Sequence, residues 1–129
     1  MDSTDKVKYW IDLAKEDIGV AEVLLDGKKL LYAGFMSHLS VEKALKAKIE
    51  SIGETPHKIH NLIRLAEIGG ILDNMSEEQK ALLDVLNPLQ IEARYPAYKQ
   101  QIAELLTNEE CADMIKQAKE LIEWIEKQL

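Results

Sequence analysis

The sequence predicts an all-α protein, an up-and-down bundle of about five helices in one domain spanning residues 1–129. Two observations support this prediction. Apolar residues recur at spacings of three and four over long segments, which is the period of a helix that buries one face. The chain also has no run of alternating β-branched residues and no Asn-Gly hairpin signal, so no strand is predicted. A length of 129 residues suits a single domain.

Five segments show the helical period: 5–26, 30–52, 56–68, 76–93 and 108–128. The first and last segments have the most regular apolar stripes, and antiparallel bundle helices bury such stripes against each other. The first stripe is Val7, Ile11, Ala14, Ile18, Ala21 and Leu25, and the last is Cys111, Ile115, Ala118, Ile122, Ile125 and Leu129.

Helix starts are predicted at capping residues, whose side chains accept hydrogen bonds from the first free N–H groups. Ser76 with Gln79 and Thr107 with Glu110 fit the reciprocal capping box. The remaining predicted starts are Thr4 and Thr55, the latter followed by Pro56 as first helical residue.

Helix ends are predicted at glycines, which adopt the left-handed conformation without strain. These positions are Gly27, Gly53 and the pair Gly69-Gly70. Pro88 lies within the fourth segment, so we expect it to kink or interrupt that helix.

Composition and charge exclude several classes of protein. The single cysteine, Cys111, permits neither an intrachain disulfide nor a cysteine-based zinc site, and it indicates a reducing cytoplasm. The N-terminus lacks the plan of a secretion signal, and no apolar run is long enough to span a membrane. A net charge of -7 argues against nonspecific nucleic-acid binding, which requires a basic surface.

The second segment has a polar interruption in its apolar stripe. His38 and Glu42 occupy adjacent turns of that stripe and are spaced to touch. They either satisfy each other at the bundle edge, or the helix is rotated so that Leu39 carries the stripe, or they line a polar cleft that binds a ligand. We interpret Lys43, Lys46 and Lys48 as the solvated face of this helix.

Known catalytic and cofactor motifs are missing from the chain. His57 and His60 have a spacing that can bind a metal, but no third ligand can be named, so we expect no metal site. We interpret them as residues that line a helix start or that hydrogen-bond to a neighbouring loop. No nucleophile elbow or glycine-rich phosphate loop occurs, so we predict no catalytic residue and no cofactor, and Cys111 is read as a core residue.

Arg94 stands out because the chain has only two arginines against fourteen lysines. Arginine is suited to planar, bidentate recognition of phosphate or carboxylate. With Tyr95 beside it, Arg94 is suited to holding a phosphate while a base stacks on the ring, or else to an ion pair across the bundle.

Taken together, the chain resembles the HEPN family (higher eukaryotes and prokaryotes nucleotide-binding domain). The residues that carry the resemblance are Gly53 and Pro56 followed by His60-Asn61-Leu62, together with the segments 10–17, 40–47 and Ala-Arg-Tyr-Pro at 93–96. The resemblance implies a homodimeric helical bundle that is often paired with a minimal nucleotidyltransferase, in some cases as a toxin and antitoxin.

Many members of the resembled family are metal-independent ribonucleases with an Arg-x(4–6)-His motif. Neither arginine here is followed by a histidine at that distance, so this motif is missing. We therefore favour a module without chemistry that binds an ATP-like nucleotide or a nucleotidyltransferase, with Arg94, Tyr95, His60, His38 and Glu42 as its site. The alternatives are a ribonuclease toxin with RNA as substrate, which we disfavour, and a structural dimer that scaffolds a catalytic partner.

Overall fold

The computed structural model describes residues 2–92 and 106–129, and within them the prediction of an all-α bundle of about five helices is confirmed. The described part contains no strand. Its elements are α1 (Ser3–Asp26), α2 (Leu30–Ser51), α3 (Leu62–Ile68), the 3-10 turn η1 (Leu72–Asn74), α4 (Glu77–Glu92) and α6 (Asn108–Glu126). None of the helices in these ranges is long and apolar enough to cross a bilayer.

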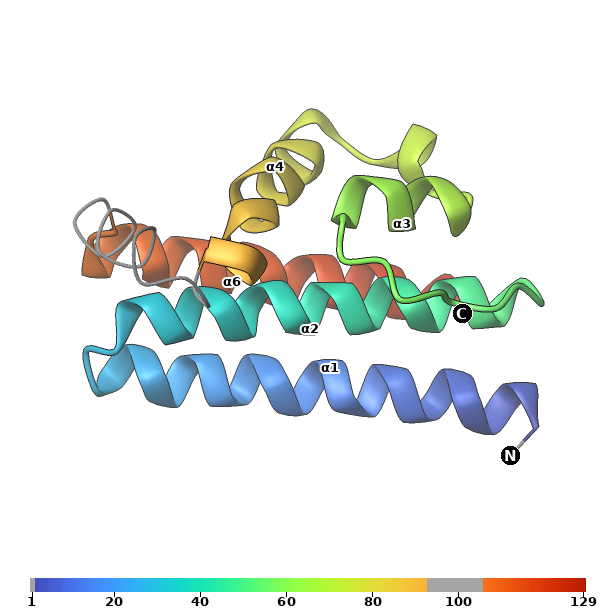
Figure 1. The fold of residues 1–129 in the computed structure, drawn as a ribbon, viewed down its shortest axis with the longest axis horizontal. Helices are drawn as coiled ribbons and strands as arrows, with labels where there is room; N and C mark the ends of the chain where they lie inside the picture. The colour runs from blue at the N-terminus through green and yellow to red at the C-terminus, as the bar shows by residue number, and fades with distance from the viewer. Residues whose placement is uncertain (1, 93–105) are drawn as a thin grey trace.

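Helix α2 is the centre of the molecule (Figure 1). Helix α1 runs antiparallel to it on one side, α6 lies beside both, and α3 and α4 cover another side of α2. Because it has neighbours on several sides, α2 buries far more of its residues than its amphipathic partners α1 and α6 do. The buried side of α2 therefore includes polar residues.

The apolar stripes predicted for α1 and α6 form much of the core. Ile11, Ala14, Ile18 and Ala21 are buried from α1, while α6 contributes all of its predicted stripe except Leu129. Leu129 follows the last turn of α6 and is 40% exposed, so its assignment to the stripe is wrong. The fully buried Cys111 confirms its interpretation as a core residue, and burial raises the pKa of its thiol.

The predicted helix starts at Ser76 and Thr107 are confirmed. Gln79 N–H donates to Ser76 Oγ and Ser76 N–H donates to Gln79 Oε1, while Thr107 Oγ1 accepts from Glu110 N–H. Helix α1 begins earlier than predicted, because Asp2 rather than Thr4 caps it by accepting from Asp5 N–H.

Helix α4 runs through Pro88 without interruption, contrary to one of the two expected outcomes. Gly53 and Gly70 have positive φ angles of 83° and 76° after their helices, as predicted. The prediction for Gly27 is wrong: its φ is -82°, and the left-handed residue is Lys28 with a φ of 62°.

Helix α3 begins six residues later than predicted. Residues 54–61 are not helical, so Thr55 is not a cap and Pro56 is not a first helical residue. Instead, Asn61 Oδ1 accepts from the N–H groups of Ile63 and Arg64. The N–H of Leu62 donates to Asn87 Oδ1 on α4, at 2.8 Å. Two asparagine side chains, one of them from a distant helix, thus decide where α3 starts.

Candidate functional site

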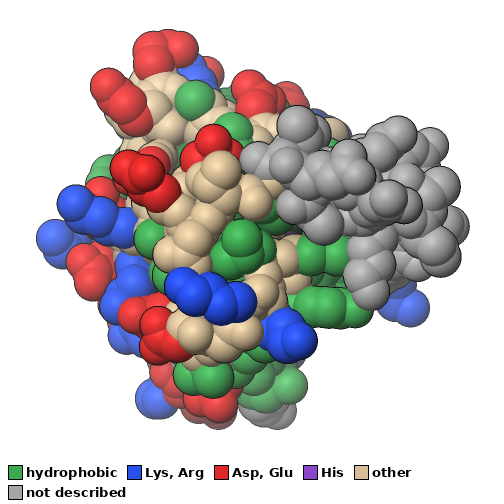
Figure 2. All heavy atoms as spheres, turned by 90° about the vertical axis from the view of Figure 1, so that its left-hand side faces the viewer, with side chains coloured by type: hydrophobic (Ala, Val, Ile, Leu, Met, Phe, Trp, Pro, Cys, Tyr) green, Lys and Arg blue, Asp and Glu red, His purple; other side chains and the backbone are tan. Residues whose placement is uncertain are grey.

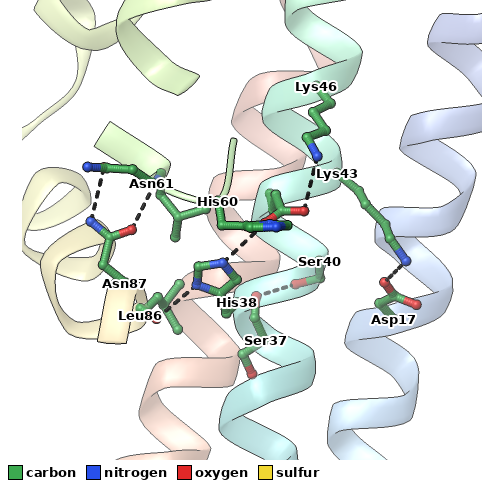
Figure 3. Close-up of polar contacts among 12 residues, drawn as sticks. Asp17, Ser37, His38, Ser40, Lys43, Lys46, His60, Asn61, Leu86 and Asn87 are labelled. Carbon is green, nitrogen blue, oxygen red and sulfur yellow. Dashed lines mark hydrogen bonds and ion pairs between the residues drawn. The ribbon is translucent and has the colours of Figure 1, made fainter. Parts of the chain in front are cut away.

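Glu42 is the centre of a buried polar cluster on α2 (Figure 3). Its Oε1 lies 2.8 Å from His60 Nδ1 and 3.3 Å from His38 Nε2, and its Oε2 lies 3.2 Å from Lys46 Nζ. The residue is 4% exposed. A carboxylate this far from water must be paired and hydrogen-bonded, and three side chains do so here. We call Glu42, His38, Lys46 and His60 the Glu42 cluster.

Helical spacing and one loop build this cluster. His38, Glu42 and Lys46 follow one another at four-residue intervals, so they share a face of α2. His60 comes from the non-helical residues 54–61, and its Nδ1 faces the Glu42 carboxylate. The cluster therefore joins two segments of the chain that lie 18 positions apart.

The hydrogen bonds of Glu42 determine its ionisation. Burial by itself raises the pKa of the Glu42 carboxyl, because it disfavours the charged form. The hydrogen bonds from His38 and His60 and the charge of Lys46 outweigh burial and lower this pKa to about 2. Glu42 is thus an anion at neutral pH, held by the groups around it.

His38 is fully buried and connects the cluster to α4. Its Nδ1 lies 2.9 Å from the carbonyl oxygen of Leu86, which can only accept a hydrogen bond. Its Nε2 faces the Glu42 carboxylate, which is also an acceptor. His38 therefore bridges the Glu42 carboxylate on α2 and the backbone of α4.

His60 is the member of the cluster that meets solvent. Its side chain is 45% exposed, whereas that of Glu42 is 5% exposed. The Nδ1–H donates to Glu42, which leaves Nε2 as the nitrogen available to a ligand. A carboxylate that orients a histidine in this way presents a base when the ring is neutral and a hydrogen-bond donor to an anion when it is protonated.

The loop that carries His60 is anchored to α4 through neighbouring asparagines. Asn87 Nδ2 donates to Asn61 Oδ1 at 3.3 Å, and Asn87 Oδ1 accepts from Leu62 N–H. These bonds hold the backbone on the C-terminal side of His60, and Figure 3 shows the two side chains facing each other. Asn87 is thus a positioning residue for this segment.

The structure brings His38, Glu42 and His60 together, as the sequence hypothesis required. His38 and Glu42 face into the bundle, and Leu39 is half-buried, so helix rotation does not explain the polar interruption. Arg94 and Tyr95 lie outside the described residues. His57 and His60 do not open a helix as predicted, because α3 starts only at Leu62.

Sequence reasoning missed Lys46 and Asn87. The sequence pattern assigns Lys46 to a solvated face, but the residue is 8% exposed and pairs with Glu42. Lys43 is also not free in solvent, because it pairs with Asp17 of α1 at 2.5 Å. The four-residue spacing from Glu42 to Lys46 was a usable signal. For Asn87 the sequence contains no such signal, because its partners Leu62 and Asn61 lie 25 and 26 positions away.

In residues 2–92 and 106–129, no group of three or more His, Cys, Asp and Glu side chains is placed to hold a metal ion. The arrangement can instead orient an imidazole, carry a proton, and bind an anion.

Comparison with known proteins identifies the fold. A model of the family described as HEPN domain matches residues 7–128. The crystal structure of TT1696 from Thermus thermophilus is similar with a TM-score of 0.79 and 20% identity, over 96% of this chain and 98% of that one. ST0689, described as an archaeal HEPN homologue, has a TM-score of 0.75 and 24% identity, with 95% and 96% covered. No curated protein sequence matches the chain.

Proposed function

The chain belongs to the HEPN domain family, and on this basis we propose that it is a nucleotide-binding module that serves a nucleotidyltransferase partner and performs no chemistry itself. The observation that supports this proposal is the half-exposed His60, whose ring is fixed by the buried Glu42. A fixed imidazole at the surface is a suitable contact for a phosphate. In this proposal Arg94 and Tyr95 supply further contacts to phosphate and base.

The charges of the Glu42 cluster are compatible with an anionic ligand. The Lys46 ammonium offsets the charge of the Glu42 carboxylate. When His60 is protonated, the four side chains together carry a positive charge. A phosphate that approaches His60 Nε2 therefore meets a net attraction rather than the repulsion of an unpaired carboxylate.

The direct test is the binding of ATP to the full chain, measured by titration calorimetry. We expect saturable binding that His60→Ala and Arg94→Ala each weaken about tenfold, because each removes a charge-assisted hydrogen bond. Two matched controls are available. His57→Ala removes an exposed histidine of the same loop, and Arg64→Ala removes the other arginine, which pairs with Glu67 on the surface.

The outcome of this titration separates the proposal from its alternatives. If wild type fails to bind ATP at millimolar concentration, alone and with its partner, the nucleotide-binding proposal is wrong. A scaffold that only holds a catalytic partner would give that result. Equal losses for His57→Ala and His60→Ala would also contradict it, since only His60 is held by Glu42.

The proposed partner and the proposed homodimer need separate measurements. Affinity purification from the native cell followed by mass spectrometry should recover a nucleotidyltransferase in stoichiometric amount, and light scattering should give twice the monomer mass. If such a partner is recovered, the two proteins can then be tested as a toxin and antitoxin pair. We propose a cytoplasmic location, on the basis of the single cysteine.

A metal-independent ribonuclease is the second candidate, and the Glu42–His60 pair is the observation in its favour. A carboxylate-oriented imidazole can remove the 2′-hydroxyl proton, with Arg94 stabilising charge on the phosphate. The net charge of -7 counts against an RNA substrate. At the end of the bundle where α1 turns into α2, Figure 2 shows acidic and basic side chains interspersed among the described residues.

RNA cleavage in the presence of EDTA tests this candidate. A ribonuclease should cleave RNA with EDTA present and lose this activity in His60→Ala and in Arg94→Ala. An equal rate of cleavage for wild type and the two variants would assign the activity to a contaminant.

A further inference from the structure

We propose that Trp10, with Tyr9 at its edge, is the surface on which the base of a bound nucleotide stacks. The site would then take base-carrying nucleotides rather than phosphate compounds in general. This inference rests on the proposed nucleotide-binding function and names the part of the ligand that gives selectivity.

The first observation is the contact between Trp10 and the Glu42 cluster. Lys46 Nζ lies 5.6 Å from the centre of the Trp10 ring, within the range of a cation–π interaction. The same ammonium group donates to Glu42 Oε2 at 3.2 Å. Trp10 of α1 therefore packs against Lys46 of the cluster on α2. Lys46 in turn binds Glu42, the side chain that holds His60.

The second observation is the exposure of aromatic surface at this place. Tyr9 is 50% exposed, and Trp10 is only partly buried against the core. Their ring centres are 6.0 Å apart with an angle of 65° between the planes, which is an edge-to-face pair. Tyr9 thus presents aromatic surface to solvent at the edge of the Trp10 ring.

A short series of contacts connects the aromatic pair to the phosphate contact. His60 Nδ1 binds Glu42 Oε1, Lys46 binds Glu42 Oε2, and Lys46 packs on the Trp10 ring. A nucleotide has its base at one end and its phosphates at the other. In this proposal the base stacks on Trp10 while the phosphates approach His60. Stacking tolerates any base because every base has a π-face, so we expect weak discrimination between bases.

The test compares a ligand with a base and one without: ATP and inorganic tripolyphosphate. In wild type we expect ATP to bind about tenfold more tightly than tripolyphosphate, because only ATP can stack. In Trp10→Leu we expect the affinity for ATP to fall to that for tripolyphosphate, while tripolyphosphate binding stays unchanged. The unchanged tripolyphosphate affinity shows that the variant is folded. Tyr9→Leu should produce a smaller loss for ATP alone.

Two controls make the test specific to Trp10. Trp124→Leu changes the only other tryptophan, which lies on α6, and should leave both affinities unchanged. In a Trp124→Phe protein, fluorescence comes from Trp10 alone among tryptophans, and ATP but not tripolyphosphate should quench it.

The possible failures are distinguishable. If ATP and tripolyphosphate bind wild type equally and Trp10→Leu changes neither affinity, the stacking inference is overturned while the nucleotide-site proposal survives. If neither ligand binds wild type, the proposed function is wrong and the inference is overturned with it. If Trp10→Leu weakens both ligands equally, Trp10 supports the site structurally and no base stacks on it.

Discussion

Two regions of this molecule contain acid–base pairs in very different surroundings. Between α1 and α6, Lys15 pairs with Glu126 at 2.5 Å and Lys119 pairs with Glu22 at 3.2 Å, and these side chains are 39–50% exposed. In the Glu42 cluster the carboxylate is 5% exposed and has three cationic or protonatable partners. The contact distances are similar in both regions, but the access of water is not.

The difference shows that burial, rather than the number of ion pairs, sets the energetic importance of a pair. Water and salt screen the pairs between α1 and α6, so such contacts contribute little to stability. In the cluster, removing the central carboxylate leaves the buried Lys46 ammonium without its counterion. The exposed pairs are therefore replaceable, and the buried ones make α2, α4 and the His60 loop depend on one another.

The largest expected effect comes from removing the central carboxylate. Glu42→Ala should destabilise the protein by about 3–5 kcal/mol, because it leaves the buried Lys46 ammonium uncompensated. Glu22→Ala, which removes a carboxylate of the exposed pair with Lys119, is the matched control and should cost less than about 1 kcal/mol. Urea unfolding followed by circular dichroism measures both values. Equal losses would contradict the contrast between the regions.

Acid should weaken the cluster selectively. The folded-state pKa of Glu42 is about 2 against an ordinary value of 4.5, so its stabilisation is present above pH 4.5 and is lost as pH falls towards 2. Between pH 7 and pH 3, wild type should lose about 2 kcal/mol more stability than Glu42→Gln, which has no carboxylate to protonate. Parallel pH profiles for the two proteins would contradict the lowered pKa.

Breaking the anchor of the His60 loop should have a moderate effect. Asn87→Ala leaves Leu62 N–H without its acceptor and removes the bond to Asn61, which should cost about 1 kcal/mol. Asn108→Ala is the control, since Asn108 accepts an exposed contact from Lys28. Urea unfolding gives the loss. The NMR signals of the His60 ring should shift in Asn87→Ala alone if the loop moves.

The smallest expected effect comes from the exposed pair of Lys15 and Glu126. Lys15→Ala should change stability by no more than about 0.5 kcal/mol, and the change should vanish in concentrated salt. Thermal unfolding at low and high NaCl measures this. A salt-resistant loss of several kcal/mol would show that the α1–α6 pairs behave like the buried cluster.

Much of the fold was predictable because it depends on local periodicity. The stripes of α1 and α6 repeat every three to four residues, and such a pattern buries the same side whatever the neighbouring helices are. The capping box at Ser76 was predictable for the same reason, since both of its partners are three residues apart. The polar interruption at His38 and Glu42 was visible as a break in such a pattern.

The errors lie where contacts between distant residues decide the local structure. Pro56 is acceptable at a helix start, yet α3 begins at Leu62 because Asn87 from α4 accepts its N–H. The sequence pattern of its own helix alone predicts that Lys46 is exposed to solvent. It is buried because Trp10 of α1 and Glu42 hold it on a helix that is covered on several sides.

The sequence by itself determined that this chain forms helices, where most of them end, and which HEPN features it carries, because capping, periodicity and motifs act over a few residues. Only the tertiary structure decided that Glu42 has three partners and that His60 is half-exposed beside it. Those facts depend on which helices cover α2 and where the loop crosses it. The same carboxylate on a solvated face would have an ordinary pKa and would hold nothing in place.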